Sequence, residues 1–404
     1  MYFEQITLKS GQKRWVCAAD GPADPVTGKR KQIWRRGKTK GEAKRRVEKA
    51  VKALEVHKVD ENKIARVTFD QVAQKWLETY KLTGVKRGTV RIREKEINIL
   101  NRHMAKTPIK DINYSFYQHF INTIAPDYAR TTVQGVNTCA NMIFKFAMRD
   151  NLIKDQPNRD VVIPRKARTV EEIESGPIEQ NYLTTEELNE LLTAATENGL
   201  DLDVERFYLL AFTGMRSGEL CALKWSDVDF NKNTIRITKT IYNETNNMRE
   251  YELTPPKSEG SIRTFGVEGE VMSLLRSHRK RQMNVNMRYR NEFGDYHDGN
   301  FIFCRSNGYP FVQKNVGDRM RRLLQYTTIQ KAATPHIFRH THISMLTEAG
   351  VDLPTIMERV GHDDMQTTMR IYTHVTKKMQ EDASEKISKF YKESFKSMNL
   401  DVSK

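Results

Sequence analysis

The chain has 404 residues, 38% of them hydrophobic and 29% charged, and it carries a net charge of +16. A chain of this length is expected to hold two or three domains, and its apolar share excludes a protein that is disordered throughout. The positive excess excludes neither an enzyme nor a binding protein, but it favours a polyanionic partner.

The sequence predicts a cytoplasmic protein without a membrane partner. No apolar run approaches the roughly 20 residues that cross a bilayer, and the N-terminal stretch MYFEQITLKSGQKR has no signal-peptide core. The four cysteines lie far apart and form no Cys-x-x-Cys pair. We therefore expect reduced thiols, as in a cytosolic protein.

Positive charge is concentrated at the N-terminus. Residues 1–58 hold 16 Lys and Arg against 6 Asp and Glu, which gives +10 of the +16 of the whole chain. Such an asymmetry is typical of a surface that binds a polyanion such as DNA. The alternative is a solvated basic surface that serves solubility alone.

Residues 1–58 are predicted to form a small three-stranded β-sheet followed by a helix. The stretches YFEQITL, KRWVCAA and KRKQIWRR alternate or are rich in β-formers, and GPADPVTG is a turn between the last two. A capping box at Thr39–Glu42 predicts the start of the helix. Because a sheet face can dock in a DNA groove, the basic side chains of this unit are candidate DNA contacts: Arg14, Lys31, Arg35, Arg36 and Lys38.

A polar linker is predicted at residues 59–67, and an all-α domain of four or five helices at 68–158. Its first helix is expected to start at Thr68, with Gln71 three residues on as the second half of a capping box. The basic segment KLTGVKRGTVRIRE is predicted to begin a helix and to contact phosphates, although a solvated helix end explains it equally well. The candidate contacts are Lys86, Arg87, Thr89 and Arg91.

A second linker is predicted at residues 159–181, followed by a third domain at 182–404. The capping box Thr184–Glu187 is expected to open its first helix. This domain is predicted to be mainly helical with a small antiparallel sheet, so the fold class of the whole chain is multidomain α+β.

Five stretches of the third domain carry polar residues that could do chemistry. FTGMRSGELCALKWSDVDF places Arg216 at a helix start, and Lys257 follows in the turn PPKSEGS before the strand SIRTFGV. FIFCRSNGYP reads as a short strand and turn. TPHIFRHTHISML holds His336 and Arg339, three residues apart and therefore on one helix face. GHDDMQTTMRIYTHV holds His362 and Tyr372.

This series strongly resembles the tyrosine recombinases of the phage integrase family. The matching pieces are T-G-M-R-S-G-E-L, L-K-W-S-D-V, H-I-F-R-H-T, V-G-H-D-D and Y-T-H, in the family's order and at its separations. The resemblance covers roughly residues 182–385. It extends more loosely to the helical domain, as a core-DNA-binding module, and to residues 1–58, as an arm-site-binding domain. Departures from the pattern are small: Val360 stands in place of leucine, and Ile337 and Phe338 replace aspartate and leucine.

The resemblance implies a role for each polar residue. Arg216 and Arg339 would clamp the non-bridging oxygens of a DNA phosphate, which suits the planar, paired donors of a guanidinium. Tyr372 would be the nucleophile and form a 3′-phosphotyrosyl link. Lys257 would protonate the leaving 5′ oxygen, His336 would take the phenolic proton, and His362 would hydrogen-bond the phosphate.

Alternatives remain for two of these assignments. Lys224 and Lys239 compete with Lys257 as proton donor, because one sequence does not fix the alignment of a β-hairpin. His336, His340 and His342 are crowded enough to suggest zinc, but their motif lacks a nearby acid or cysteine. No metal and no other cofactor is expected, and the chain has no GxxxxGK[ST] phosphate loop.

The predicted function is integration and excision of a mobile element, by site-specific recombination through a Holliday junction. The expected partner is double-stranded DNA at core and arm sites, bound by a homotetramer of this chain. The resemblance also implies an excisionase and a DNA-bending host factor. The expected location is the nucleoid in a bacterial cytoplasm. The tail has apolar residues at helical spacing, Ile387, Phe390, Tyr391 and Phe395, and is expected to dock on a neighbouring subunit rather than on its own domain. A type IB topoisomerase and a non-enzymatic DNA-binding regulator are the alternatives.

Overall fold

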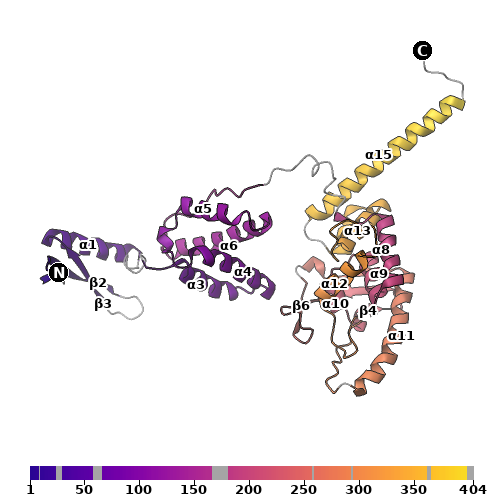
Figure 1. Cartoon of the computed structure of the whole chain (residues 1–404), viewed down its shortest axis with the longest axis horizontal. Coiled ribbons are helices and arrows are strands. Elements are labelled where there is room, and N and C mark those ends of the chain that lie inside the picture. Colours follow the sequence, from indigo (N-terminus) through magenta and orange to yellow (C-terminus); the bar gives the residue numbers. More distant parts are fainter. Residues whose placement is uncertain are drawn as a thin grey trace, which may run out of the picture. The chain divides into compact units, whose positions relative to one another are not determined.

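The computed structural model describes residues 1–8, 10–23, 30–57, 66–165, 181–256, 259–292, 294–361 and 365–397. The chain divides into two compact units, Met1–Ala167 and Arg168–Lys404, and each is treated by itself. Helices dominate, and the described strands form small antiparallel sheets (Figure 1). This mixed composition agrees with the predicted α+β class.

The N-terminal sheet has the three strands that the sequence predicts, in the order β1 (Tyr2–Thr7), β2 (Lys13–Ala23) and β3 (Arg30–Gly37). All pairings are antiparallel. Helix α1 (Lys40–His57) packs on β2 and β3. Because successive side chains of a strand point to opposite faces, Cys17 meets Ala43 and Val47 of α1 on one face. On the other face Trp34 is 47% exposed.

The predicted cap of α1 differs in one detail from the standard capping box. The Thr39 hydroxyl accepts the Glu42 amide at 3.2 Å, as expected. The Glu42 carboxylate instead accepts the amide of Lys38 at 2.7 Å, one residue before the expected partner. Both bonds satisfy amides at the start of the helix, where no intrahelical acceptor exists.

The rest of the first unit is helical, as predicted. It holds α3 (Phe69–Lys81), α4 (Arg87–Met104), α5 (Tyr114–Ile124) and α6 (Arg130–Arg149), with a 3-10 turn at Ile109–Asp111. The Thr68–Gln71 capping box that opens α3 is confirmed. The apolar faces of these helices meet in one core around Phe69, Tyr117 and Phe144, which lie edge to face.

The second unit combines two small sheets with eight α-helices among its described residues. Strands β4 (Val228–Asp229), β5 (Thr234–Ile237) and β8 (Arg263–Gly266) form one antiparallel sheet, and β6 (Thr240–Asn243) and β7 (Tyr251–Thr254) form a hairpin. The helices are α8 (Thr185–Asn198), α9 (Asp203–Thr213), α10 (Ser217–Ala222), α11 (Gly269–Glu292), α12 (Gln313–Leu324), α13 (Ile337–Glu348), α14 (Leu353–Val360) and α15 (Met365–Ser397). The predicted Thr184–Glu187 capping box opens α8.

Two clusters form the core of this unit. The larger one includes residues of α8 to α13 and of the β4-β5-β8 sheet. The smaller one joins Ile343 of α13, Ile356 and Val360 of α14, and Ile371 and Val375 of α15. Across the described residues, no helix is long and apolar enough to cross a membrane.

We predict that Gly37→Ala loosens the N-terminal sheet. A Cβ at Gly37 would lie 2.5 Å from the backbone nitrogen of Ala43, so α1 would have to move away from β3. The expected cost is about 1–3 kcal/mol, measured as faster hydrogen exchange of β3 amides in the full chain. The control is Gly41→Ala, because a Cβ there meets nothing within 4 Å and alanine favours a helix by about 1 kcal/mol over glycine. Equal exchange in the two variants would contradict this account of Gly37.

Candidate active site

Arg216 is held at the start of α10 by its own helix. It is the N-cap residue, and its backbone N–H donates to Glu219 Oε2 at 3.0 Å. Its Nη1 donates to Glu219 Oε1 at 2.8 Å, and its Nη2 donates to the carbonyl of Gly361 at 3.3 Å. The Arg216 side chain is 34% exposed while that of Glu219 is 2% exposed. A buried carboxylate therefore fixes a guanidinium that still reaches the surface.

Arg339 comes from α13 and is completely buried. Its Nη1 donates to the carbonyl of Gly214 at 2.9 Å, and its Nη2 donates to the carbonyl of Val360. Burial, together with the neighbouring Arg216 guanidinium, lowers the pKa of Arg339 well below its usual range. Arg339 thus links the turn after α9 to the end of α14.

Gly214 makes this link possible. It ends α9 in the left-handed region with φ +62°, which favours glycine. A Cβ at Gly214 would also lie 2.8 Å from the ring of His342. Any larger residue would therefore move the carbonyl that holds Arg339.

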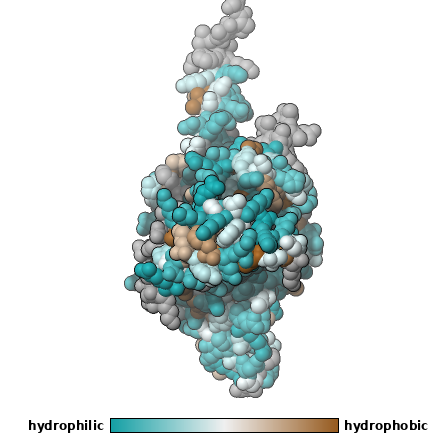
Figure 2. Space-filling view, turned by 90° about the vertical axis from the view of Figure 1, so that its left-hand side faces the viewer, coloured by the Kyte–Doolittle hydropathy of each residue, from teal (hydrophilic) through white to brown (hydrophobic). Residues whose placement is uncertain are grey.

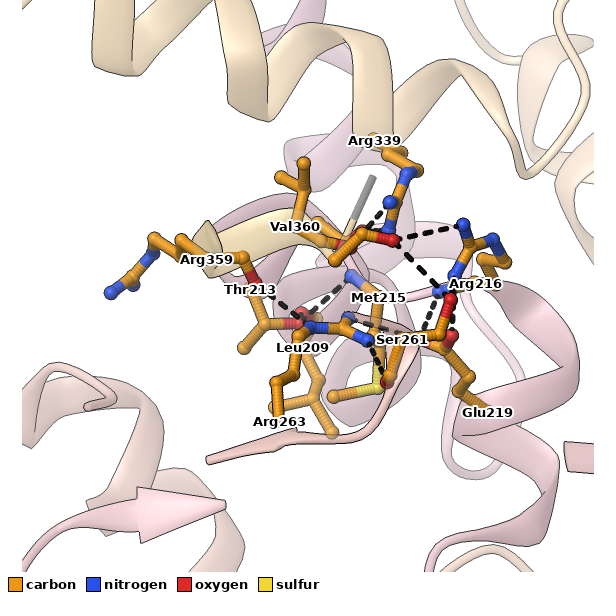
Figure 3. A network of polar contacts seen from close by, with 12 residues as sticks. Leu209, Thr213, Met215, Arg216, Glu219, Ser261, Arg263, Arg339, Arg359 and Val360 are labelled. Carbon is orange, nitrogen blue, oxygen red and sulfur yellow. Dashed lines mark hydrogen bonds and ion pairs between the residues drawn. The ribbon is translucent and has the colours of Figure 1, made fainter. Parts of the chain in front are cut away.

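Three arginines converge on the end of α14 (Figure 3). The carbonyl of Arg359 accepts Arg263 Nε at 2.8 Å, that of Val360 accepts Arg339, and that of Gly361 accepts Arg216. The last carbonyls of a helix lack intrahelical partners and attract cations. We call Arg216, Arg263 and Arg339 the arginine cluster.

One buried carboxylate contacts two members of the arginine cluster. Glu219 Oε2 accepts Arg263 Nη2 at 3.0 Å, and Glu219 Oε1 accepts Arg216. Burial would raise the pKa of Glu219, but Arg263 and Arg216 outweigh it and lower that pKa. The carboxylate is therefore ionised, and it contacts two of the three guanidiniums of the cluster.

His336 and His340 lie beside the cluster on α13. Their rings meet edge to face with centroids 4.7 Å apart. Partial desolvation, then His340 and the guanidiniums of Arg339 and Arg216, lowers the pKa of His336, although the residue as a whole is exposed. His336 is neutral at pH 7 and can accept a proton.

His342 has a structural environment that differs from that of His336. Arg359 Nε donates to its Nε2 at 3.1 Å, so Nδ1 carries the proton and donates to the carbonyl of Ala211 at 3.0 Å. Both ring nitrogens are engaged. The three histidines that suggested zinc therefore do not present a shared set of free ligands.

Tyr372 lies half-buried near the start of α15 and packs on the smaller core cluster. That cluster includes Val360, whose carbonyl holds Arg339, and Tyr182, which is buried and meets His374 edge to face. The helix of Tyr372 is thereby packed against α13 and α14, which carry Arg339 and the arginine-capped carbonyls.

Lys257 and His362 lie outside the described residues. Gly361, which precedes His362, and Ser261, four residues after Lys257, do belong to the network, because the Ser261 hydroxyl donates to the carbonyl of Gly361 at 3.4 Å. The rival lysines have other contacts. Lys239 Nζ lies 2.6 Å from Asp227 Oδ1, and Lys224 Nζ lies 4.9 Å from the centre of the Phe301 ring.

The predicted DNA contacts of residues 1–58 fall on different faces of the sheet. Arg14, Arg36 and Lys38 line one hollow with Arg46 of α1. Arg46 Nη1 donates to the carbonyl of Arg36 at 2.9 Å. Arg35 pairs in register with Cys17 and so faces α1. The side chain of Lys31 lies outside the described part of the structure.

The predicted contacts of the helical region gather at the start of α4. Lys86 is the N-cap residue, and the first turn of the helix contains no acidic residue. Lys86 and Arg87 are exposed, whereas Thr89 and Arg91 are half-buried. A basic helix start of this kind favours an anion.

Sequence reasoning missed four residues of these sites: Glu219, Ser261, Arg263 and Arg46. One signal was available for Arg263. In the strand SIRTFGV, alternate side chains point to the same face, so Arg263 shares the buried face with Phe265. Ile262 points the other way and is 49% exposed. A charged residue therefore occupies a buried position at which an apolar residue is expected.

The family profile described as "Phage integrase family" matches residues 181–379, and that of "Phage integrase, N-terminal SAM-like domain" matches residues 68–125. The integrase of Staphylococcus phage L54a is 30% identical over 338 residues, covering 81% of this chain and 94% of the relative. The ICEBs1 integrase of Bacillus subtilis is 26% identical over 304 residues, covering 72% and 75%.

Solved structures show the same fold at low identity. The Tn1549 transposon integrase in complex with transposon right end DNA has a TM-score of 0.61 at 21% identity, covering 80% of this chain and 100% of that one. A lambda integrase tetramer bound to a Holliday junction has a TM-score of 0.56 at 14% identity, covering 91% and 94%. From its fold, its matched regions and its relatives, the chain belongs to the phage integrase family, the tyrosine recombinases.

Proposed function

We propose that this chain is an integrase that cuts and rejoins DNA through a 3′-phosphotyrosyl intermediate, and so integrates and excises a mobile element. The arginine cluster is the observation that carries the proposal. It places three guanidiniums on three helix-end carbonyls, and two of them also contact the one carboxylate, Glu219. A phosphate diester brings the negative charge that such a cluster lacks.

Two members of the cluster, Arg216 and Arg339, would stabilise the transition state. Attack on a phosphodiester builds negative charge on the non-bridging oxygens of a pentacoordinate phosphorus. Arg216 is partly exposed and can reach those oxygens, while Arg339 is anchored on two carbonyls. Preorganised donors of this kind typically contribute about 10²–10³ in rate.

The remaining residues would move protons and form the covalent bond. The Tyr372 oxygen attacks phosphorus, and its proton passes to His336, which is neutral. The bond from phosphorus to the 5′ oxygen breaks, and Lys257 protonates the leaving group. His362 hydrogen-bonds a phosphate oxygen. The 5′-hydroxyl of another strand reverses these steps, so the reaction requires neither ATP nor a metal.

DNA would be held by three modules: an arm-binder at residues 1–58, a core-binder at 68–158 and the catalytic domain at 182–404, joined by linkers. The hollow at Arg14, Arg36 and Lys38 and the basic start of α4 support this division. Phosphate contacts make binding steeply dependent on salt. An excisionase, a DNA-bending host factor and a location on the nucleoid of a bacterial cytoplasm belong to the same proposal.

The exposed tail supports exchange between subunits of a tetramer. Every side chain from Lys377 to Glu393 that the structure describes is exposed, including Ile387, Phe390 and Tyr391. This part of α15 projects from the rest of its unit (Figure 1). In the space-filling view a brown patch interrupts its teal surface (Figure 2). An isolated helix with an exposed apolar stripe is only marginally stable in water. We therefore propose that a second copy of the chain packs against this stripe.

A type IB topoisomerase would use the same chemistry as a monomer. The exposed tail and the basic N-terminal unit favour the recombinase. A non-enzymatic DNA-binding regulator would leave the buried arginine cluster without a purpose.

We predict that Tyr372→Phe abolishes the covalent protein–DNA adduct and leaves DNA binding within about threefold. The substitution removes the attacking oxygen and keeps the packing of the ring. The adduct is measured by denaturing gel on a nicked attachment-site DNA. The exposed Tyr391 gives the control Tyr391→Phe, which should form adduct normally. An adduct with Tyr372→Phe would refute the proposed nucleophile.

We predict that Arg339→Lys lowers the single-turnover rate of adduct formation about 10²–10³-fold. An ammonium cannot span the carbonyls of Gly214 and Val360 and still face a phosphate. The comparison is Arg281→Lys on α11, at a guanidinium that pairs with Glu205 outside the cluster. A rate within threefold of the unmodified chain would contradict this role of Arg339.

We predict that a chain truncated after Ser384 cleaves single sites but assembles poorly on paired DNA. The cut removes Ile387, Phe390 and Tyr391 and leaves the turn of Tyr372 intact. Single-site adduct should stay within about threefold, while cooperative assembly, measured by analytical ultracentrifugation with DNA, should be lost. Retained assembly would favour a tail that packs on its own domain.

A further inference from the structure

Arg263 is a buried arginine at the start of β8, 8% exposed, and all three of its nitrogens have acceptors. Nη2 donates to Glu219 Oε2 at 3.0 Å, Nε to the carbonyl of Arg359 at 2.8 Å, and Nη1 to the carbonyl of Ser261 at 3.1 Å. Its guanidinium carbon lies 5.4 Å from the centre of the Phe265 ring. Arg263 therefore uses Nε, Nη1 and Nη2 within the protein, on one carboxylate and two backbone carbonyls.

We propose that Arg263 is a positioning residue that keeps Arg216 available for the phosphate by holding the second oxygen of Glu219. This inference rests on the proposed recombinase function and adds a residue to it. Figure 3 shows Arg263 and Arg216 approaching Glu219 from different elements. Glu219 Oε1 receives Arg216 Nη1, and Glu219 Oε2 receives Arg263 Nη2.

The geometry explains why the shared carboxylate matters. A carboxylate and a guanidinium prefer two parallel hydrogen bonds. With Arg263 in place, Arg216 has one such bond and keeps Nη2 on the carbonyl of Gly361. Without Arg263, Glu219 Oε2 would keep the Arg216 amide but lose its guanidinium partner, and the carboxylate could then rotate to pair with both Nη atoms of Arg216. That pairing would draw the Arg216 guanidinium away from the carbonyl of Gly361. It would also neutralise the positive charge that Arg216 would otherwise offer to a phosphate.

Arg263 also supports the turn at the end of α14. A Cβ at Gly361 would lie 3.0 Å from Arg263 Cδ and 3.1 Å from its Nη1, so the turn packs directly on this side chain. The carbonyl of Arg359, at the same turn, accepts Arg263 Nε. Loss of Arg263 would therefore affect two partners of Arg216, the Glu219 carboxylate and the Gly361 carbonyl.

The test measures single-turnover adduct formation by the full chain on a nicked attachment-site DNA. Arg263→Gln should lower the rate about 10²-fold, as expected for a small misplacement of a catalytic group, with the dissociation constant for DNA within threefold. The matched control is Arg281→Gln, which also removes a guanidinium from a buried carboxylate, Glu205. Its rate should stay within threefold.

The discriminating variant is the double substitution Arg263→Gln with Glu219→Gln. If Glu219 captures Arg216 when Arg263 is lost, then neutralising Glu219 should release Arg216 and raise the rate about tenfold above Arg263→Gln alone. A purely structural role predicts that the double variant is as slow as Arg263→Gln or slower. That outcome, or a rate for Arg263→Gln within threefold of the unmodified chain, overturns the proposal.

Arg263→Lys covers the case in which Arg263→Gln does not fold. It keeps one charged donor for Glu219, so its rate should lie between those of the unmodified chain and Arg263→Gln, about 10-fold down. A rate equal to that of the unmodified chain would overturn the proposal here too. If the unmodified chain formed no adduct at all, the proposed recombinase function would be refuted. If the unmodified chain formed adduct and the Arg263 variants did so at the same rate, only the proposed role of Arg263 would be refuted.

Discussion

The capping of one helix end by three guanidiniums is the interaction on which the rest of the catalytic unit depends. Arg216, Arg263 and Arg339 come from α10, β8 and α13, and they meet on consecutive carbonyls at the end of α14. These carbonyls carry the negative end of the helix dipole. Elements that are distant in sequence are therefore fixed around one point by charge as well as by apolar packing.

This arrangement is costly unless an anion binds. Arg339 is buried beside two other guanidiniums, and burial with this repulsion lowers its pKa. Glu219 supplies one negative side chain for two of the three cations. A site with this excess of buried positive charge would bind a phosphate more tightly than a neutral site would, because electrostatic attraction is stronger where water is excluded. In the proposed reaction, the same charge would favour the pentacoordinate transition state over the starting diester.

Local patterns in the sequence predicted much of the fold and part of the site. The capping boxes at Thr68 and Thr184 and the three N-terminal strands are confirmed, because such signals depend on residues a few positions apart. The roles of Arg216, His336, Arg339 and Tyr372 followed from the family motif and remain proposals. Arg263 could not be found this way, since its bond to Glu219 spans 44 positions and its bond to Arg359 spans 96.

The most direct measurement is a structure of the Tyr372→Phe chain bound to an intact core-site DNA. The account predicts that the non-bridging oxygens of the scissile phosphate lie within about 2.7–3.2 Å of nitrogens of both Arg216 and Arg339, with the ring at position 372 facing that phosphorus. The account would be contradicted if the scissile phosphate bound elsewhere and neither guanidinium contacted DNA in any subunit.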